Sequence, residues 1–209
     1  VTGGTRGIGA EIAGAFLSHG AQVVVCGRRQ PEALPTGGAG TARFVAADVR
    51  DAASVDALVT DIETTEGRLD VVINNAGGAP HAQAAEASPR FHEAIVALNL
   101  LAPLHVAQRA NGVMQAQEGG GSIVNIASVS GVRPSPGTAA YGAAKAGLIN
   151  LTSSLAVEWA PKVRMNAVIA KDGATPAALA EGRRILRIAR FDYTVMVIVV
   201  ADMVMKPTA

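Results

Sequence analysis

The chain has 209 residues, of which 49% are hydrophobic and 17% are charged, and its formal net charge at pH 7 is +1. This balance excludes a disordered chain, and the length fits one domain over residues 1–209. A net charge near zero offers no electrostatic basis for binding nucleic acid or an anionic membrane. The single cysteine, Cys26, excludes an internal disulfide and a multi-cysteine metal site, and it suits a reducing, cytoplasmic location. The most apolar run, residues 195–200, is too short to span a bilayer.

A glycine-rich turn, VTGGTRGIG, opens the chain at residues 1–9. Glycine adopts positive φ at little cost and lets the backbone approach a ligand closely. The helix that follows directs free N–H groups and the positive end of its dipole at the turn, an arrangement that suits a pyrophosphate. An ordinary strand–helix connection is the alternative. Only Val1 and Thr2 precede the turn, where a buried strand is expected, so we expect the natural chain to start several residues earlier.

Strands and helices are predicted to alternate along the chain. Near-continuous apolar runs predict strands at residues 22–26, 43–47, 69–73, 122–127 and 163–169, and a last strand is predicted at 193–205. Helices are predicted at residues 11–19, 54–66 with Ser54 as N-cap, 88 to about 108 with Ser88 as cap, 139–159 and 181–190, and a loop at 31–40. Apolar strands between helices indicate an α/β, doubly wound, Rossmann-type parallel sheet of about seven strands, covered by helices on both faces.

Polar side chains stand where the predicted strands end. They are Thr2, Arg28, Asp48, Asn74, Asn75 and Ser128. In open parallel sheets, ligands bind outside the carboxyl ends of the strands, near the switch point of the strand order. These positions therefore predict a ligand site along one edge of the sheet.

Tyr141 and Lys145 are four residues apart on a predicted helix, so their side chains share a face. A lysine cation near a phenol lowers its pKa from about 10, which lets the phenol exchange a proton with an alcohol or carbonyl near neutral pH. Ser128, at a strand end, is placed to hydrogen-bond the same substrate oxygen. The alternative is an unremarkable pair on an exposed helix.

Asn99 lies inside the helix that starts at Ser88, four residues before Pro103. Proline has no N–H, so the carbonyl of Asn99 loses its usual helical donor. That carbonyl is then free to hold a water linking Lys145 to solvent. A simple helix kink is the alternative.

Together, TGGTRGIG (2–9), Asp48, NNAG (74–77), Asn99, Ser128 and YGAAK (141–145) resemble the short-chain dehydrogenase/reductase family in its single-domain form, over roughly residues 1–169. The resemblance implies an NAD(P)(H)-dependent oxidoreductase that acts on a small ketone or secondary alcohol. It implies Tyr141 as acid/base, Lys145 as the residue that lowers its pKa and binds the nicotinamide ribose, Ser128 as the group that positions the substrate oxygen, and Asn99 as holder of a relay water. It implies a cofactor site at Gly3, Thr5, Arg6, Gly7, Ile8, Gly9, Arg28, Arg29, Asp48, Val49, Asn75, Ala76, Gly77, Tyr141, Lys145 and Thr175. A homotetramer or homodimer built from the helices starting near 88 and 139 is also implied.

The segment after the strand predicted at 22–26 favours NADP(H) over NAD(H). NAD enzymes of this fold place an acidic residue there to bind the ribose 2′-hydroxyl, whereas this chain has Cys26-Gly27-Arg28-Arg29. An arginine holds a 2′-phosphate through charge-assisted hydrogen bonds. Arg6 resembles the second basic residue of NADP-preferring members. Solvated loop arginines, with NAD(H) as cofactor, are the alternative.

Residues 170–209 depart from the family pattern. Ala170-Lys171 replaces the usual Pro-Gly, although Thr175 falls where a threonine contacts the nicotinamide carboxamide. Four arginines further on suggest a solvated helix face, with phosphate binding as the alternative: Arg183, Arg184, Arg187 and Arg190. Because the family builds its substrate pocket here, the substrate is not identified. The departure also motivates a second hypothesis, a dinucleotide-binding sensor or scaffold without turnover.

Overall fold

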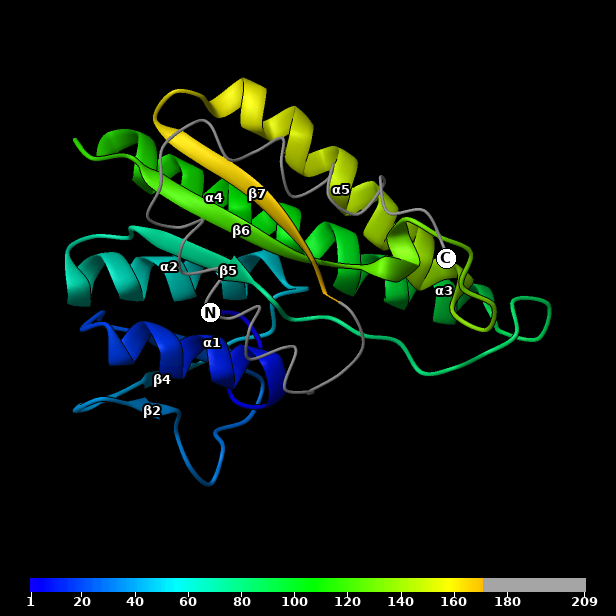
Figure 1. Cartoon of the computed structure of the whole chain (residues 1–209), viewed down its shortest axis with the longest axis horizontal. Coiled ribbons are helices and arrows are strands. Elements are labelled where there is room, and N and C mark those ends of the chain that lie inside the picture. Colours follow the sequence, from blue (N-terminus) through cyan, green and yellow to red (C-terminus); the bar gives the residue numbers. More distant parts are fainter. Residues whose placement is uncertain (171–209) are drawn as a thin grey trace, which may run out of the picture.

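The computed structural model describes residues 1–170. In this part of the chain, parallel strands alternate with helices, as Figure 1 shows. The strand predicted at 193–205, the helix predicted at 181–190 and Thr175 lie outside the described residues.

Five strands of the described chain run parallel to one another in two groups. β1 (Val24–Gly27) pairs with β4 (Arg43–Ala46), and β5 (Val71–Asn74), β6 (Gly121–Ser128) and β7 (Val163–Ala170) form a sheet in the order β5-β6-β7. Each strand lies within about two residues of its predicted bounds. The near-continuous apolar runs predicted these elements well because buried parallel strands require them.

The first three residues join the two groups of strands. Thr2 N–H donates to the Ile73 carbonyl of β5 (2.9 Å), and Gly3 N–H donates to the Cys26 carbonyl of β1 (3.0 Å). Cys26 N–H in turn donates to the Val1 carbonyl (3.2 Å). The segment before the glycine turn thus occupies the place of a central strand between β1 and β5. The resulting order, β4-β1-(1–3)-β5-β6-β7, is that of a doubly wound sheet whose switch point lies at the glycine turn.

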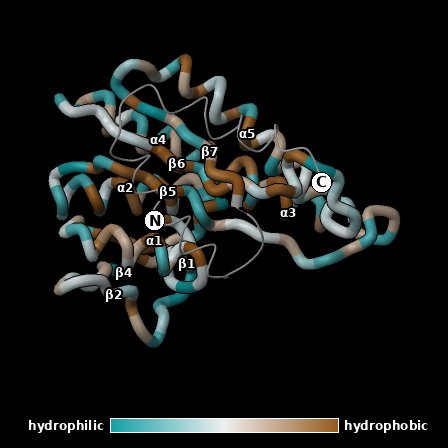
Figure 2. Tube along the Cα trace, in the orientation of Figure 1, coloured by the Kyte–Doolittle hydropathy of each residue, from teal (hydrophilic) through white to brown (hydrophobic). Residues whose placement is uncertain are grey.

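Helices cover both faces of this sheet, as predicted. On one face, Ile12 of α1 (Gly7–Ser18) packs in a cluster with the strand residues Ile73, Val124 and Val168. On the other, α2 (Ala52–Glu66), α4 (Ala102–Ala116) and α5 (Ala139–Trp159) share a larger cluster with Val72, Ile123 and Met165. Figure 2 shows the hydrophobic stretches of the trace along these strands. Successive residues along these strands therefore pack into two separate hydrophobic layers, one on each face of the sheet.

Two local predictions are wrong. Ser54 is not the cap of α2: the Asp51 side chain accepts from Ala53 N–H (3.3 Å), while Ser54 Oγ accepts from Asp48 N–H at the end of β4 (3.0 Å). The predicted loop at 31–40 contains a short antiparallel hairpin, β2 (Thr36–Gly37) and β3 (Gly40–Thr41), which packs on α1. Local sequence does not reveal either outcome because both depend on neighbouring elements.

The helix that starts at Ser88 is interrupted at Asn99. Ser88 caps α3 (Pro89–Val96) as predicted, since its Oγ accepts from Phe91 N–H (3.2 Å). The backbone then passes through a π-helical turn, Ala97–Leu101, before α4 begins. Pro103 has no N–H to offer the preceding turn, and the wider hydrogen-bond spacing accommodates this.

Candidate active site

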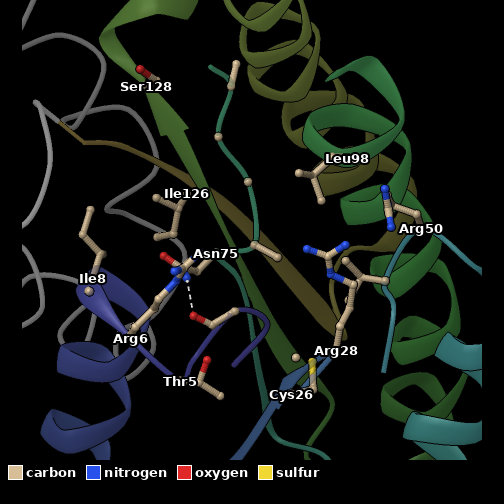
Figure 3. A pocket seen from close by; sticks show the side chains of 18 of the residues that line it. Thr5, Arg6, Ile8, Cys26, Arg28, Arg50, Asn75, Leu98, Ile126 and Ser128 are labelled. Carbon is tan, nitrogen blue, oxygen red and sulfur yellow. Dashed lines mark hydrogen bonds between the residues drawn. The ribbon is translucent and has the colours of Figure 1, made fainter. Parts of the chain in front are cut away.

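A cleft of about 1760 Å³ lies along the carboxyl ends of the strands. Its wall contains most of the site residues predicted from the sequence: Gly3, Thr5, Arg6, Gly7, Ile8, Arg28, Arg29, Asp48, Val49, Asn75, Ala76, Gly77, Ser128, Tyr141 and Lys145. Figure 3 shows Thr5, Arg6, Cys26 and Arg28 gathered at one end of the cleft and Ser128 at the other. The two remaining described residues, Gly9 and Asn99, are buried behind the wall.

The glycine turn is fastened to the end of β5. Gly3 and Gly7 have φ of +60° and +55°, a conformation that side chains with a Cβ rarely adopt. The Asn75 amide donates to the carbonyls of Thr2 (3.1 Å) and Gly3 (3.2 Å), and it points at the turn in Figure 3. Thr2 Oγ1 accepts from the N–H groups of Asn75 and Ala76, both at 3.0 Å. These contacts fix the position of the glycine turn at the N-terminus of α1.

The first turn of α1 keeps its N–H groups free of side-chain caps. Arg6 is the N-cap residue, and its side chain makes no cap hydrogen bond. Helix N-termini normally satisfy these donors with a capping side chain, water or a ligand. Here they face a cleft, which is the arrangement that binds phosphate groups.

Arginines surround the end of the cleft nearest β1 and β4. Arg50, which the sequence analysis did not single out, donates twice to the Asp48 carboxylate, from Nε (2.9 Å) and from a terminal nitrogen (2.5 Å). This hydrogen bonding, with a contribution from the charge of Arg28, lowers the pKa of Asp48 to about 2. In the sequence, the only indication of this ion pair is that Arg50 stands two residues after Asp48, at the end of a predicted strand. Asp48 is therefore an ion-paired carboxylate rather than a free negative charge.

Lys145 reaches the middle of the cleft from inside the protein. Its side chain is buried, Nζ donates to the Ile126 carbonyl at the end of β6 (2.7 Å), and Nζ lies 5.7 Å from the centre of the Tyr141 ring. Burial lowers the pKa of Lys145 to about 8. The spacing of the two residues on α5 thus brings a buried amine beside the phenol ring.

Ser128 ends β6 with its hydroxyl at the cleft wall. Its Oγ accepts from Ser130 N–H (3.2 Å), and this contact caps the short 3-10 turn Val129–Gly131. With that lone pair occupied, the Ser128 proton remains available for a ligand oxygen.

Asn99 holds the loop after β5 with its side chain. Oδ1 accepts from Gly78 N–H (2.8 Å), and Nδ2 donates to the carbonyls of Gly78 and Ile95 (2.9 Å each). From the sequence, only the backbone carbonyl of Asn99 was predicted to act, and its role in a water relay stays a prediction. The side-chain role was not visible because it joins residues 21 positions apart.

Gly77 separates Asn99 from Lys145, and replacing it with alanine is expected to disturb both. A Cβ there would lie 2.7 Å from Asn99 Oδ1 and 3.3 Å from Lys145 Nζ. We expect Gly77→Ala to lower the free energy of unfolding by about 1–3 kcal/mol, measured by urea denaturation, because a packed polar cluster must shift. Gly112→Ala is the matched control, since no atom of residues 1–170 lies within 4 Å of its Cβ and alanine favours its helix. Equal stability of the two variants would contradict this packing.

Three further hydroxyl residues, Ser130, Ser135 and Thr138, line the cleft beside Tyr141. Residues 129–138 lie between a predicted strand and a predicted helix, and no function was predicted for them. The cluster of Ser and Thr immediately before a predicted helix could have pointed to these cleft-lining residues, but such residues are common in any turn.

Within residues 1–170, every helix is too short or too polar to cross a bilayer.

Sequence comparison finds relatives of this chain among known proteins. A sequence model of the family described as short chain dehydrogenase matches residues 1–182. The chain is 37% identical to 2-(S)-hydroxypropyl-CoM dehydrogenase 3 of Xanthobacter autotrophicus over 176 residues, which are 80% of this chain and 68% of that protein. It is also 37% identical to D-threitol dehydrogenase of Mycolicibacterium smegmatis over 174 residues, 80% of this chain and 66% of that protein. The chain thus spans about two thirds of the length of these relatives.

Solved structures show the same likeness. A metagenomic short-chain oxidoreductase in complex with NADP superposes with a TM-score of 0.82 at 31% identity, covering 92% of this chain and 89% of that one. A short chain dehydrogenase from Mycobacterium smegmatis superposes with a TM-score of 0.82 at 29% identity, covering 90% of this chain and 83% of that one. These findings confirm the resemblance in the sequence and the predicted Rossmann-type fold. The chain belongs to the short-chain dehydrogenase family of dinucleotide-dependent oxidoreductases.

Proposed function

We propose that this protein is an NADP(H)-dependent oxidoreductase that interconverts a ketone and a secondary alcohol, with Tyr141 as the acid/base. One observation carries the proposal. Ser128, Tyr141 and Lys145 line the same cleft as the glycine turn, so a proton-transfer group and a dinucleotide-binding loop face one space.

The residues of the cleft suit a dinucleotide. The uncapped first turn of α1 and the glycines at positive φ would hold the pyrophosphate. Asp48 and Val49 would meet the adenine, and Asn75, Ala76 and Gly77 would support the middle of the cofactor. When bound, the nicotinamide supplies the hydride, while the protein orients the reactants and moves the proton.

Three side chains would handle the substrate oxygen. Ser128 would donate a hydrogen bond to it, because its own lone pair is occupied by Ser130 N–H. Tyr141 would give its hydroxyl proton to that oxygen during ketone reduction and take it back during alcohol oxidation. The charged Lys145 amine, 5.7 Å from the ring centre, would favour the phenolate that remains.

Asn99 would act in the proton supply. Its side chain holds Gly78 beside the cleft, and its backbone carbonyl would hold the water through which Tyr141 and Lys145 exchange protons with solvent. In this proposal the π-helical turn serves the relay by widening the helix at Asn99.

The charges at the β1 end of the cleft support NADP(H) as the preferred cofactor. Among residues 1–170, four arginines line this region, at positions 6, 28, 29 and 50, against two carboxylates, Glu32 and Asp48, and Arg50 already pairs with Asp48. A 2′-phosphate would therefore meet arginines that form no ion pair within residues 1–170, and guanidinium groups bind phosphate through charge-assisted hydrogen bonds. The NADP carried by one structural relative agrees with this preference.

Replacing Arg28 with aspartate tests the cofactor preference. We expect Arg28→Asp to lower the ratio of kcat/KM for NADPH to that for NADH by about a hundredfold, because a charge-assisted bond is replaced by repulsion. Steady-state rates with both cofactors measure this ratio. Arg90→Asp is the control, since Arg90 is exposed on α3 and does not line the cleft. An unchanged ratio in Arg28→Asp would contradict the assignment, and cofactor binding without turnover on any ketone would favour the sensor hypothesis.

We also propose that copies of the chain associate through α5 and that the protein works in the cytoplasm. Val157 on α5 is 78% exposed, and Ala143 and Ala146 of the same helix are exposed small residues that permit close helix packing. The buried free thiol of Cys26 suits a reducing compartment. Sedimentation of the protein over a concentration series tests the association.

A further inference from the structure

Three side-chain hydroxyls form a hydrogen-bonded chain in the cleft wall next to Tyr141. Ser130 Oγ lies 3.1 Å from Ser135 Oγ, and Ser135 Oγ lies 2.6 Å from Thr138 Oγ1. All three residues line the cleft and are partly buried. None of them belongs to the acid/base set or to the cofactor site proposed above.

Local helix capping does not explain this hydroxyl chain. Thr138 is the N-cap residue of α5, a position where a threonine hydroxyl usually accepts from the helix backbone. Its side chain makes no such cap bond and instead contacts Ser135, both at Oγ and at the carbonyl (3.3 Å). The loop thus forgoes the cap that stabilises other helices, and the Thr138 hydroxyl contacts its neighbour Ser135 instead.

The protons of the hydroxyl chain leave its Ser130 end open to a ligand. Each hydroxyl has one proton and two lone pairs. If Thr138 donates to the Ser135 carbonyl, Ser135 can donate to Thr138 and Ser130 to Ser135, so that Ser130 offers a lone pair to the cleft. If the direction reverses, Thr138 donates to Ser135 and Ser135 to Ser130, whose proton then faces the cleft. The Ser130 hydroxyl can therefore either accept a hydrogen bond from a ligand or donate one to it.

A ligand hydroxyl has the same dual character and complements either direction of the chain. An alkyl group in its place would remove the water from Ser130 without replacing its hydrogen bond, which is unfavourable. From residue 128 to residue 141, the described part of the lining contains Ser128, Ser130, Ser135, Pro136, Thr138 and Tyr141, with no charged side chain among them. This stretch is thus suited to a neutral polar group rather than to a carboxylate or phosphate.

We propose that the hydroxyl chain Ser130–Ser135–Thr138 is a substrate subsite that binds a hydroxyl group neighbouring the reacting carbon. The substrate class is then a hydroxyketone and the corresponding diol or polyol. This inference rests on the proposed function, because Tyr141 defines where the reacting carbon lies.

The test compares two ketones that differ only by a hydroxyl in place of a methyl group, 1-hydroxybutan-2-one and pentan-3-one. The full chain with NADPH is expected to show a kcat/KM at least about tenfold higher for the hydroxyketone, the usual effect of one net hydrogen bond. Ser130→Ala and Thr138→Val should each bring this ratio close to one. Ser153→Ala is the matched control, since Ser153 is exposed on α5, its hydroxyl donates to the Ile149 carbonyl, and it is not among the described residues that line the cleft.

The outcomes separate this subsite from the proposed reaction. A ratio near one in the unchanged protein, or a ratio that both variants retain, overturns the subsite while leaving the oxidoreductase assignment standing. If neither ketone is reduced, binding of the two ketones to the NADP-loaded protein is compared by saturation-transfer NMR. A preference for the hydroxyketone that the variants lose then supports the subsite although the reaction fails, and equal binding overturns the subsite.

Discussion

Replacing Tyr141 with phenylalanine is expected to lower kcat for ketone reduction by about 10²–10⁴-fold, the range for loss of a positioned acid/base. Phenylalanine keeps the ring beside Lys145 Nζ and removes only the hydroxyl that would carry the proton. The packing of α5 should therefore persist, and NADPH should still bind. Initial rates of NADPH oxidation, together with a fluorescence titration of NADPH, measure the two effects separately.

A hydroxyl outside the cleft provides the control for this variant. Thr64 is exposed on α2, and its Oγ1 donates to the Thr60 carbonyl within the same helix (2.8 Å). Thr64→Val should leave kcat unchanged. Turnover by Tyr141→Phe at the rate of the unchanged protein would show that another group moves the proton, and the role proposed for Tyr141 would be wrong.

Replacing Lys145 with methionine is expected to abolish most of the activity while making the protein more stable. The Lys145 side chain is only 3% exposed, so its positive charge is held in a poorly solvated place, and burial lowers its pKa from 10.5 to about 8. This shift corresponds to roughly 3 kcal/mol of unfavourable burial near neutral pH. Methionine fills similar space without a charge, and the lost hydrogen bond to the Ile126 carbonyl offsets about 1 kcal/mol. The expected net gain at pH 7 is about 2 kcal/mol.

The stability difference between the unchanged protein and Lys145→Met should depend on pH with a definite sign. The folded protein releases the Lys145 proton near pH 8, whereas the unfolded chain keeps it up to the ordinary pKa of 10.5. Between these values the unfolded state binds more protons, so the stability of the unchanged protein rises with pH. The advantage of the variant should therefore be full below pH 8 and shrink as the pH rises toward 10.5.

Urea unfolding at pH 7 and pH 10 measures this change. Lys162→Met is the control, because Lys162 is exposed and its Nζ donates to the Gln115 carbonyl at the surface. A stability gain in Lys145→Met that stays constant with pH, or a loss at pH 7, would show that the buried amine is not the strained group inferred here. Active sites that keep a charged group buried commonly lower the stability of the fold in this way.

The sheet and most helices followed from local patterns. The helix predicted at 139–159 has those bounds in the structure. A segment rich in Ser, Pro and Gly precedes this helix and Pro161 follows it, so the sequence marks both of its ends. Ser88 and Pro89 likewise predicted the start of α3 correctly. The cap of α2 was predicted wrongly since Asp51 and Ser54 are both good caps, and the contact of Ser54 with the end of β4 decides between them.

The family was also visible in the sequence, because its motifs depend on residue types at the ends of apolar runs. Glycines before a helix, an Asn-Asn pair at the end of β5, and Tyr141 and Lys145 one helical turn apart together indicated the family, and the comparisons confirm it. Which residues act within the site remains proposed. Residue types and their spacing along the chain can carry this information because an α-helix and a strand each fix the direction of neighbouring side chains.

The tertiary structure decided what the surrounding residues do. Lys145 reaches the Ile126 carbonyl, Asn99 holds Gly78, and the hydroxyl of Thr138 turns from its helix toward Ser135. Lys145 and Ile126 lie 19 positions apart and Asn99 and Gly78 lie 21 apart, distances at which sequence periodicity gives no information about contact. The Thr138 contact is local, yet the same residue suits a cap equally well, so only the folded loop distinguishes the two. By itself, the sequence therefore determined the fold and the class of chemistry, whereas packing between distant segments determined the burial of the amine and the polar wall of the cleft.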